Sequence, residues 1–168
     1  MTQQQDLFAH LLPNNEPRHV ERLQKVQAGL PSNLYLGTTS WSNEDWEGLV
    51  YPDGCAAKDY IEHYARAFRA VEIDSTWYRV PSERAIDAWL ERTPEDFIFS
   101  AKVPRVVSHE KCLVDCQQEM DEFIAVMRRM GDRLGSLLMQ FAYVARGKDA
   151  DENEHGRDFC RRLGSRAK

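Results

Sequence analysis

Features that would identify several protein classes are scarce in this sequence. Only four of its 168 residues are cysteines, and no two of them form a CxxC pair, so the thiols are most simply free in a reducing compartment. No apolar run approaches the length of a membrane-spanning helix. Residues 1–17 lack the basic-then-apolar pattern of a signal peptide. These absences predict a cytoplasmic protein that does not associate with membranes.

Several catalytic motifs are also missing. The sequence contains no HExxH segment, no glycine-rich phosphate loop and no GxSxG elbow, so metalloprotease, P-loop and α/β-hydrolase functions have no support. Cys112 and Cys116 stand four residues apart with His109 upstream, but no second pair of ligands follows, so no metal site is predicted there. The set Glu72, Asp74 and His109 leaves a divalent cation open as an alternative. The cofactor is unknown at this stage.

Basic residues are outnumbered by acidic ones. Asp and Glu number 27 against 22 Lys and Arg, which gives a formal net charge of −5. This balance disfavours broad binding to nucleic acid, although it permits a local basic patch. Hydrophobic residues make up 42% and charged residues 29% of the chain, and these proportions are ordinary for a globular domain with a sizeable core.

What the sequence does contain is an alternation of short apolar strands with helices. The predicted strands span residues 33–38, 71–74, 97–102 and 136–141. The predicted helices span residues 58–69, 83–92 and 116–130. Ser82 is the expected N-cap of the second helix, and Asp115 with Gln118 resembles a capping box for the third. The alternation is typical of a parallel α/β sheet.

Two regions are expected along the chain. Residues 1–31 are predicted to form a helical leader, with an amphipathic helix over residues 16–30 that packs outside the first strand or docks on a partner. Residues 32–168 are predicted to form the α/β domain.

Polar side chains stand at the ends of the predicted strands. Side chains alternate between the two faces of a strand, so Glu72 and Asp74 share one face, and Lys102 shares a face with Ser100. Together with Gln140 at the fourth strand, we expect Glu72, Asp74 and Lys102 to converge at the C-terminal edge of the sheet, where barrel enzymes build their sites. A buried charge is costly unless it is paired, so these residues need each other or a ligand.

This charged group has two interpretations. It is either a buried ion network that fixes the register of the strands, or the centre of acid/base chemistry. In the second interpretation one carboxylate acts as acid or base, and Lys102 neutralises a substrate phosphate or carboxylate. His109 would serve as a further base, Tyr78 would hydrogen bond a carboxylate, and Gln140 would orient the ligand.

An aromatic loop over residues 39–54 is also unusual. Trp41 and Trp46 within it either plug the barrel with their own apolar mass or offer a stacking surface for a base or sugar ring. The candidate catalytic residues are therefore Glu72, Asp74, Lys102 and His109. The candidate ligand-binding residues are Trp41, Trp46, Tyr78 and Gln140.

Several segments, in order, resemble a known family. These are LYLGTTSWSNEDWEGLVYP, AVEIDSTWYRVPS, ERTPEDFIFSAKVPRVVSHEKCL and LGSLLMQF, and they resemble the YecE-like family of unknown function over about residues 34–141. The resemblance implies a TIM (β/α)8-barrel-type fold, in a family without an established activity. It places the family's polar pattern at Gly37, Ser40, Trp41, Glu72, Asp74, Tyr78, Lys102, Ser108, His109 and Gln140. Asp74 departs from the family's common Asn, and Trp77 from its usual Phe.

The expected fold is thus a partial barrel of about four parallel strands with covering helices, because the usual C-terminal half of the family is absent. An open half-barrel exposes strand edges and an inner apolar face that includes Leu36, Ile98 and Leu138, so self-association, or a complex with a separately made second half, is predicted. The leading function is an enzyme acting on a small anionic, sugar- or nucleotide-like ligand. The alternatives are a non-catalytic module that binds nucleic acid or protein, through the aromatic loop and Arg105, Lys111, Arg128 and Arg129, and a truncated inactive fragment.

Overall fold

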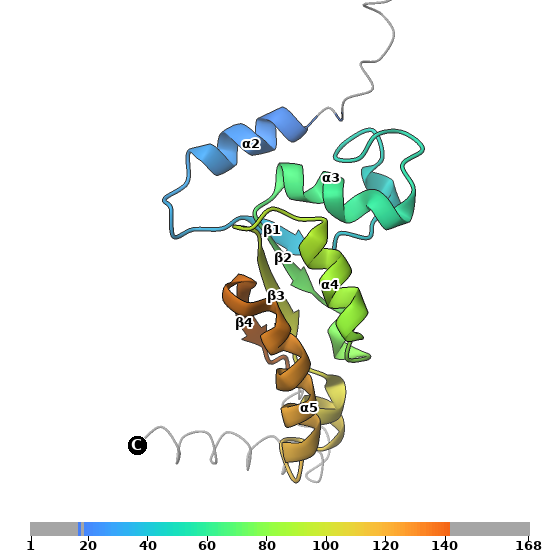
Figure 1. Ribbon diagram of the computed structural model, residues 1–168, viewed down its shortest axis with the longest axis vertical. Helices are drawn as coiled ribbons and strands as arrows, with labels where there is room; N and C mark the ends of the chain where they lie inside the picture. Colours follow the sequence, from blue (N-terminus) through green and yellow to red (C-terminus); the bar gives the residue numbers. More distant parts are fainter. Residues whose placement is uncertain (1–16, 18, 142–168) are drawn as a thin grey trace, which may run out of the picture. The chain divides into compact units, whose positions relative to one another are not determined.

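Four short parallel strands alternate with helices in the computed structural model, which describes residue 17 and residues 19–141 (Figure 1). The strands are β1 (Gly37–Thr39), β2 (Ala70–Ile73), β3 (Ile98–Lys102) and β4 (Leu134–Leu138), hydrogen-bonded in the order β1-β2-β3-β4. The α-helices are α2 (Val20–Ala28), α3 (Tyr60–Ala67), α4 (Glu83–Glu91) and α5 (Gln117–Met127). The predicted α/β class is confirmed.

The element boundaries differ from the predicted ones mainly at the first and last strands. β1 begins at Gly37 rather than at residue 33, and β4 ends at Leu138 rather than at residue 141. An apolar run marks the residues that tend to be buried, whereas a strand extends only as far as its neighbour supplies hydrogen bonds. The beginning of the predicted leader and the end of the predicted domain lie outside the described residues.

The chain forms two compact units, which are described separately. The first comprises Met1–Glu72 and Asp87–Phe99, and the second comprises Ile73–Ile86 and Ser100–Lys168. No helix in the described part of the chain is long and apolar enough to cross a membrane.

Aromatic side chains build the core of the first unit. Tyr51 stacks on Tyr60 with ring centroids 4.3 Å apart, and Tyr64 stacks on Phe68 at 4.7 Å. All four are buried. Trp46 lies parallel to Tyr64 at 6.2 Å. The aromatic loop therefore packs on helix α3.

The Tyr64 hydroxyl ties this core to two strands. It accepts a hydrogen bond from the Thr38 N–H at 2.8 Å and lies 3.0 Å from the Ala70 carbonyl oxygen, to which it donates. The register pairs Thr38 of β1 with Val71 of β2. One side chain of α3 thus hydrogen bonds the backbone of both strands.

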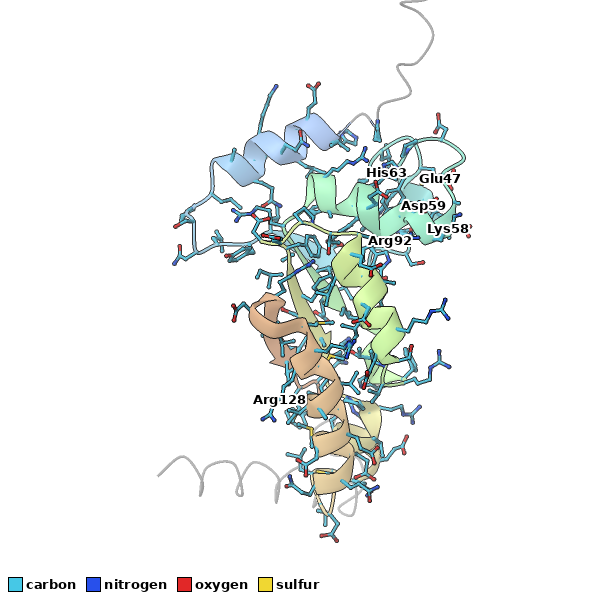
Figure 2. The ribbon with its side chains drawn as sticks, viewed as in Figure 1. Glu47, Lys58, Asp59, His63, Arg92 and Arg128 are labelled. Atoms are coloured by element: carbon cyan, nitrogen blue, oxygen red, sulfur yellow. The ribbon has the colours of Figure 1, made fainter. Side chains whose placement is uncertain are left out.

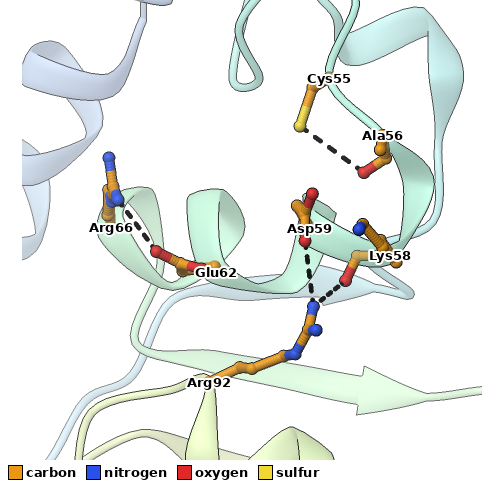
Figure 3. Close-up of polar contacts among 7 residues, drawn as sticks. All are labelled: Cys55, Ala56, Lys58, Asp59, Glu62, Arg66 and Arg92. Atoms are coloured by element: carbon orange, nitrogen blue, oxygen red, sulfur yellow. Dashed lines mark hydrogen bonds and ion pairs between the residues drawn. The ribbon is translucent and has the colours of Figure 1, made fainter.

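Polar contacts also connect α4 to the start of α3 (Figure 3). The Arg92 guanidinium donates to the Lys58 carbonyl and pairs with the Asp59 carboxylate at 3.2 Å. Arg66 pairs with Glu62 one turn earlier on α3, also at 3.2 Å. These side chains are exposed to solvent, so their contribution to stability is small.

In the second unit, Phe123 and Met127 of α5 are buried, as is Met130, which lies three residues after the helix. The predicted cap of the second helix is confirmed, because the Ser82 hydroxyl accepts from the Ala85 N–H at 3.3 Å. The predicted capping box is wrong. Cys116, not Asp115, is the N-cap of α5, and it makes no side-chain cap hydrogen bond. Asp115 lies one residue earlier, in a left-handed backbone conformation with φ of 47°.

Candidate functional site

Each of the two central strands has one buried side and one partly open side. In β2, Val71 and Ile73 are at most 2% exposed, whereas Glu72 is half-buried, as is Asp74 directly after the strand. The same alternation holds in β3, where Phe99 and Ala101 are fully buried and Ser100 and Lys102 are half-buried. The predicted placement of the polar residues on one side of each strand is confirmed. In particular, Asp74 and Lys102 both stand at strand ends.

A buried threonine holds those two strand ends together within the second unit. Thr76 is fully buried, and its hydroxyl lies 2.7 Å from both the Ile73 carbonyl oxygen and the Lys102 carbonyl oxygen. Ile73 immediately precedes Asp74. One side chain therefore fixes the backbone at the base of the Asp74 and Lys102 side chains.

β4 continues the open side of β3. The Ser100 and Ser136 hydroxyls lie 3.0 Å apart, and the Val103 N–H donates to the Leu138 carbonyl at 2.9 Å. Gln140 follows two residues after Leu138 and is exposed. Ser136 is thus on the side that carries Lys102, as the alternation predicts.

A group of aromatic and basic side chains surrounds Trp77, and we call Trp77, Tyr78, Arg105 and His109 the Trp77 cluster. Trp77 ends a short 3₁₀ helix (Ser75–Trp77), and Tyr78 follows it directly. His109 belongs to a single turn of π-helix, Val106–Glu110, and Arg105 is the residue before that turn. The Trp77 ring meets the Tyr78 ring edge to face at 4.9 Å and the His109 ring at 5.2 Å. The Arg105 guanidinium lies over the Trp77 ring at 5.3 Å.

Hydrogen bonds and an ion pair fix parts of this cluster. The Arg105 Nε atom lies 3.0 Å from the Glu110 carboxylate, and the His109 Nδ1 atom lies 2.8 Å from the hydroxyl of buried Ser108. The indole nitrogen of Trp77 is buried and has no hydrogen-bond partner among residues 19–141. A buried donor of this kind calls for a partner such as a water or a ligand oxygen.

Among residues 17 and 19–141, no carboxylate makes the predicted hydrogen bond with Tyr78. Tyr78 is 73% exposed, and in this part of the chain its contact is the Trp77 ring. A short 3₁₀ turn after β2 carries Tyr78 to the surface, where the phenol meets solvent.

The remaining candidate residues lie in the first unit. Trp41 packs edge to face on Trp89 at 5.3 Å, and Trp46 packs on Tyr64. The Glu72 carbonyl accepts from the Ser40 N–H at 2.9 Å. That these residues form one site with Lys102 stays a prediction.

Another group of titratable side chains gathers around the start of α3 (Figure 2). Glu47 accepts from the Tyr60 hydroxyl at 2.7 Å and from the Gly54 N–H at 2.9 Å. The hydrogen bond from Tyr60 lowers the pKa of Glu47, and the same bond raises the pKa of Tyr60 to about 12. Burial lowers the pKa of His63. These contacts hold the aromatic loop against α3, so we assign them a structural role.

The basic residues that nucleic-acid binding would use are mostly paired. Besides Arg105, Lys111 contacts Glu119 at 2.5 Å, and Arg129 contacts Glu83 at 3.1 Å. The hydrogen bond to Glu119 raises the pKa of Lys111 and lowers that of Glu119. Arg128 is exposed at the end of α5 (Figure 2). Local carboxylates therefore offset most of this positive charge.

Among residues 17 and 19–141, no three His, Cys, Asp or Glu side chains gather in the way that a metal ion requires. Cys112 donates to the carbonyl, not the imidazole, of His109 at 3.5 Å.

Sequence reasoning missed Trp77 and Arg105 as members of a site. From the sequence, Trp77 is identified only as a departure from Phe, and Arg105 only among the basic residues of the alternative binding module. The π-helical turn brings Arg105 back over Trp77, and no local pattern predicts such a turn. The available signal was the Trp-Tyr pair directly after one strand and an Arg three residues after Lys102.

Matches to known proteins cover most of the described chain. A family model described as "Protein of unknown function DUF72" matches residues 35–167. Over 107 residues the chain is 33% identical to UPF0759 protein YecE of Escherichia coli (strain K12), a stretch that covers 64% of this chain and 37% of YecE. UPF0759 protein YunF of Bacillus subtilis (strain 168) is 27% identical over 114 residues, which covers 64% of this chain and 39% of YunF.

Solved structures show the same fold. A DUF72 family protein from Thermotoga maritima MSB8 is 32% identical with a TM-score of 0.57, and the match covers 74% of this chain and 51% of that protein. A DUF72 family protein from Enterococcus faecalis V583 has a TM-score of 0.51 at 22% identity, covering 74% and 46%. The chain thus spans about two fifths of the curated relatives' length, 37% and 39%.

Proposed function

The chain belongs to the DUF72 family of proteins of unknown function, and from that premise we propose that it acts on a small anionic, sugar- or nucleotide-like ligand at the C-terminal ends of its strands. The observation that carries the proposal is the pairing of the β2 and β3 ends by Thr76. Its hydroxyl lies 2.7 Å from the carbonyls of Ile73 and Lys102, so Asp74 and Lys102 leave neighbouring points of the backbone.

The chemistry of these side chains supports an anionic ligand. Lys102 supplies a positive charge that neutralises a phosphate or carboxylate. Asp74 is a carboxylate in position to exchange a proton with such a ligand, and His109 offers a second group for proton transfer. Gln140 adds an amide that orients the ligand. Glu72, Trp41 and Trp46 belong to the first unit, and their part in this site stays a prediction.

Replacing Lys102 tests this proposal directly. In calorimetric titrations of the full chain with ribose 5-phosphate, Lys102→Met is expected to weaken binding by roughly 10- to 100-fold, because a hydrogen bond to a charged group contributes about 1.5–3 kcal/mol. Lys25→Met is the matched control, since Lys25 is an exposed residue of α2. Equal affinities for wild type and Lys102→Met, with both folded by circular dichroism, would contradict the proposal.

The small-ligand function is favoured over nucleic-acid or protein binding. Lys111 and Arg129 each pair with a carboxylate, so few cations remain to contact successive phosphates. A steep loss of oligonucleotide affinity between low and high salt would favour the alternative. We also propose a cytoplasmic location. The free thiols of Cys55, Cys112 and Cys116 support it.

We also propose that the chain associates with itself. Leu36 is 38% exposed and Leu138 is 43% exposed, and β1 and β4 are the edge strands of the sheet that the described residues form. Exposed apolar residues at open edges favour pairing with another chain. Sedimentation velocity in dilute solution is expected to show a dimer or larger species, and Leu138→Lys is expected to shift it toward monomer. A compact monomer of the unmodified chain, with a sharp cooperative melt, would show that the edges need no partner.

A further inference from the structure

Tyr78 presents a flat aromatic surface beside basic groups that already have a defined arrangement. Its ring is 73% exposed and stands at 90° to the Trp77 ring, with centroids 4.9 Å apart. Trp77 in turn has the Arg105 guanidinium over it at 5.3 Å and the His109 ring at 5.2 Å. The Trp77 cluster thus combines a stacking surface, a guanidinium and an imidazole around one indole.

Arg105 is held in place with most of its donors unused. Glu110 contacts it through Nε at 3.0 Å, and Trp77 supports the plane of the guanidinium. Arginine has five N–H donors, and the terminal amino groups of Arg105 donate to no residue that the structure describes. Two parallel N–H groups of this kind match the oxygens of a phosphate.

Trp77 contributes a further unused donor. Its buried indole N–H has no partner in residues 19–141, and a family-typical Phe at this position would have no such group. An acceptor that reaches Trp77 would satisfy a buried donor whose isolation costs free energy.

We propose that the Trp77 cluster recognises a nucleoside monophosphate, with its phosphate on Arg105 and its base stacked on Tyr78. The inference rests on the proposed function and names the ligand class of the same site. Every nucleobase can stack on an aromatic ring. The cluster is therefore expected to prefer ligands that have a base, without distinguishing one base from another. The carboxylate of Glu110 beside Arg105 disfavours a longer polyanion, which would bring additional phosphates near it.

The test compares three probes by calorimetry on the full chain: AMP, ribose 5-phosphate and adenosine. The unmodified protein is expected to bind AMP roughly 5- to 100-fold more tightly than ribose 5-phosphate, because base stacking contributes at this level. Tyr78→Ala should remove that preference and leave ribose 5-phosphate affinity unchanged, whereas Tyr78→Phe should keep it. Arg105→Gln should weaken AMP and ribose 5-phosphate alike.

The chain offers a matched control for the aromatic substitution. Tyr35 is 40% exposed and carries the Arg69 guanidinium over its ring at 5.0 Å, so it is an exposed tyrosine beside an arginine that does not belong to the Trp77 cluster. Tyr35→Ala should leave the affinity for AMP unchanged. A separate readout is the indole N–H resonance of Trp77, identified by its loss in Trp77→Phe, which is expected to shift with AMP and ribose 5-phosphate but not with adenosine.

The outcomes separate this inference from the proposed function. If neither AMP nor ribose 5-phosphate binds, both are wrong. If ribose 5-phosphate binds and depends on Lys102, but AMP binds no more tightly or keeps its preference in Tyr78→Ala, the function stands and the nucleotide inference is overturned. Adenosine binding as tightly as AMP would also overturn it, because the phosphate would then have no role.

Discussion

Gly37→Ala is expected to break the pairing of β1 with β2 and to lower the free energy of unfolding by about 3 kcal/mol, at the upper end of the usual cost of overpacking. A Cβ atom on Gly37 would lie 2.0 Å from the Ala70 carbonyl oxygen and 2.5 Å from the Ala70 carbonyl carbon. Both atoms belong to the backbone of the partner strand, since the register pairs Gly37 with Ala70. Because both clashing atoms are backbone atoms, no side-chain rotation can relieve the clash, and the two strands must separate.

Urea denaturation followed by circular dichroism would measure this loss. Gly29→Ala is the matched control, because a Cβ atom there meets only carbonyl oxygens at 3.5 and 3.6 Å, ordinary contact distances, and the backbone conformation is right-handed. The control should unfold at nearly the midpoint of the unmodified protein. A Gly37→Ala midpoint that matches the control would show that β1 can move aside without cost.

The sequence predicted the class of fold and the face of each strand, but it could not predict contacts of this kind. Alternation placed Val71 and Ile73 on one side of β2 and Glu72 and Asp74 on the other, because that pattern depends on the strand alone. The need for glycine at residue 37 depends on which residue of the partner strand lies opposite. The sequence around residue 37 does not predict that register. The same reason explains why β1 and β4 were placed a few residues away from their true bounds.

The candidate site was predictable to a similar extent. Asp74 and Lys102 were identified because they end apolar runs, and the structure places both at strand ends. Thr76, whose buried hydroxyl contacts the backbone of both strands, resembles any turn residue in the sequence. Arg105 joins Trp77 only because the chain makes a turn of π-helix after β3. The periodicity of apolar residues does not predict contacts that depend on such a change in backbone direction.

Tyr64 is the second position where a large effect is expected, and its two functions in the core can be separated. Tyr64→Ala should cost about 3–5 kcal/mol of stability, the range for deleting a buried aromatic ring, because Tyr64 is fully buried and stacks on Phe68. Tyr64→Phe keeps the ring but leaves the Thr38 N–H and the Ala70 carbonyl without this hydroxyl. That loss should cost about 1–3 kcal/mol.

Comparing the two variants with an exposed control separates the contribution of hydrogen bonding to stability from that of packing. Tyr35→Phe removes a hydroxyl from a 40% exposed ring, so its unfolding midpoint should match that of the unmodified protein. If Tyr64→Phe also matches, the hydrogen bonds from α3 to β1 and β2 contribute nothing net, and packing alone fixes the sheet against the helix.

Alkaline pH provides an independent readout of the same hydroxyl. Burial raises the pKa of Tyr64 above its ordinary value of 10.0, although the hydrogen bonds with Thr38 act in the opposite direction. A phenol whose pKa is higher in the folded state contributes stability that is complete below the unfolded pKa and is lost as the pH rises past it. The unmodified protein should therefore lose stability above about pH 10, and Tyr64→Phe should lose less over the same range. An equal loss of unfolding free energy in both proteins would show that Tyr64 ionises as easily in the folded protein as in the unfolded chain. The hydrogen bonds of its hydroxyl to the two strands would then not depend on its protonation.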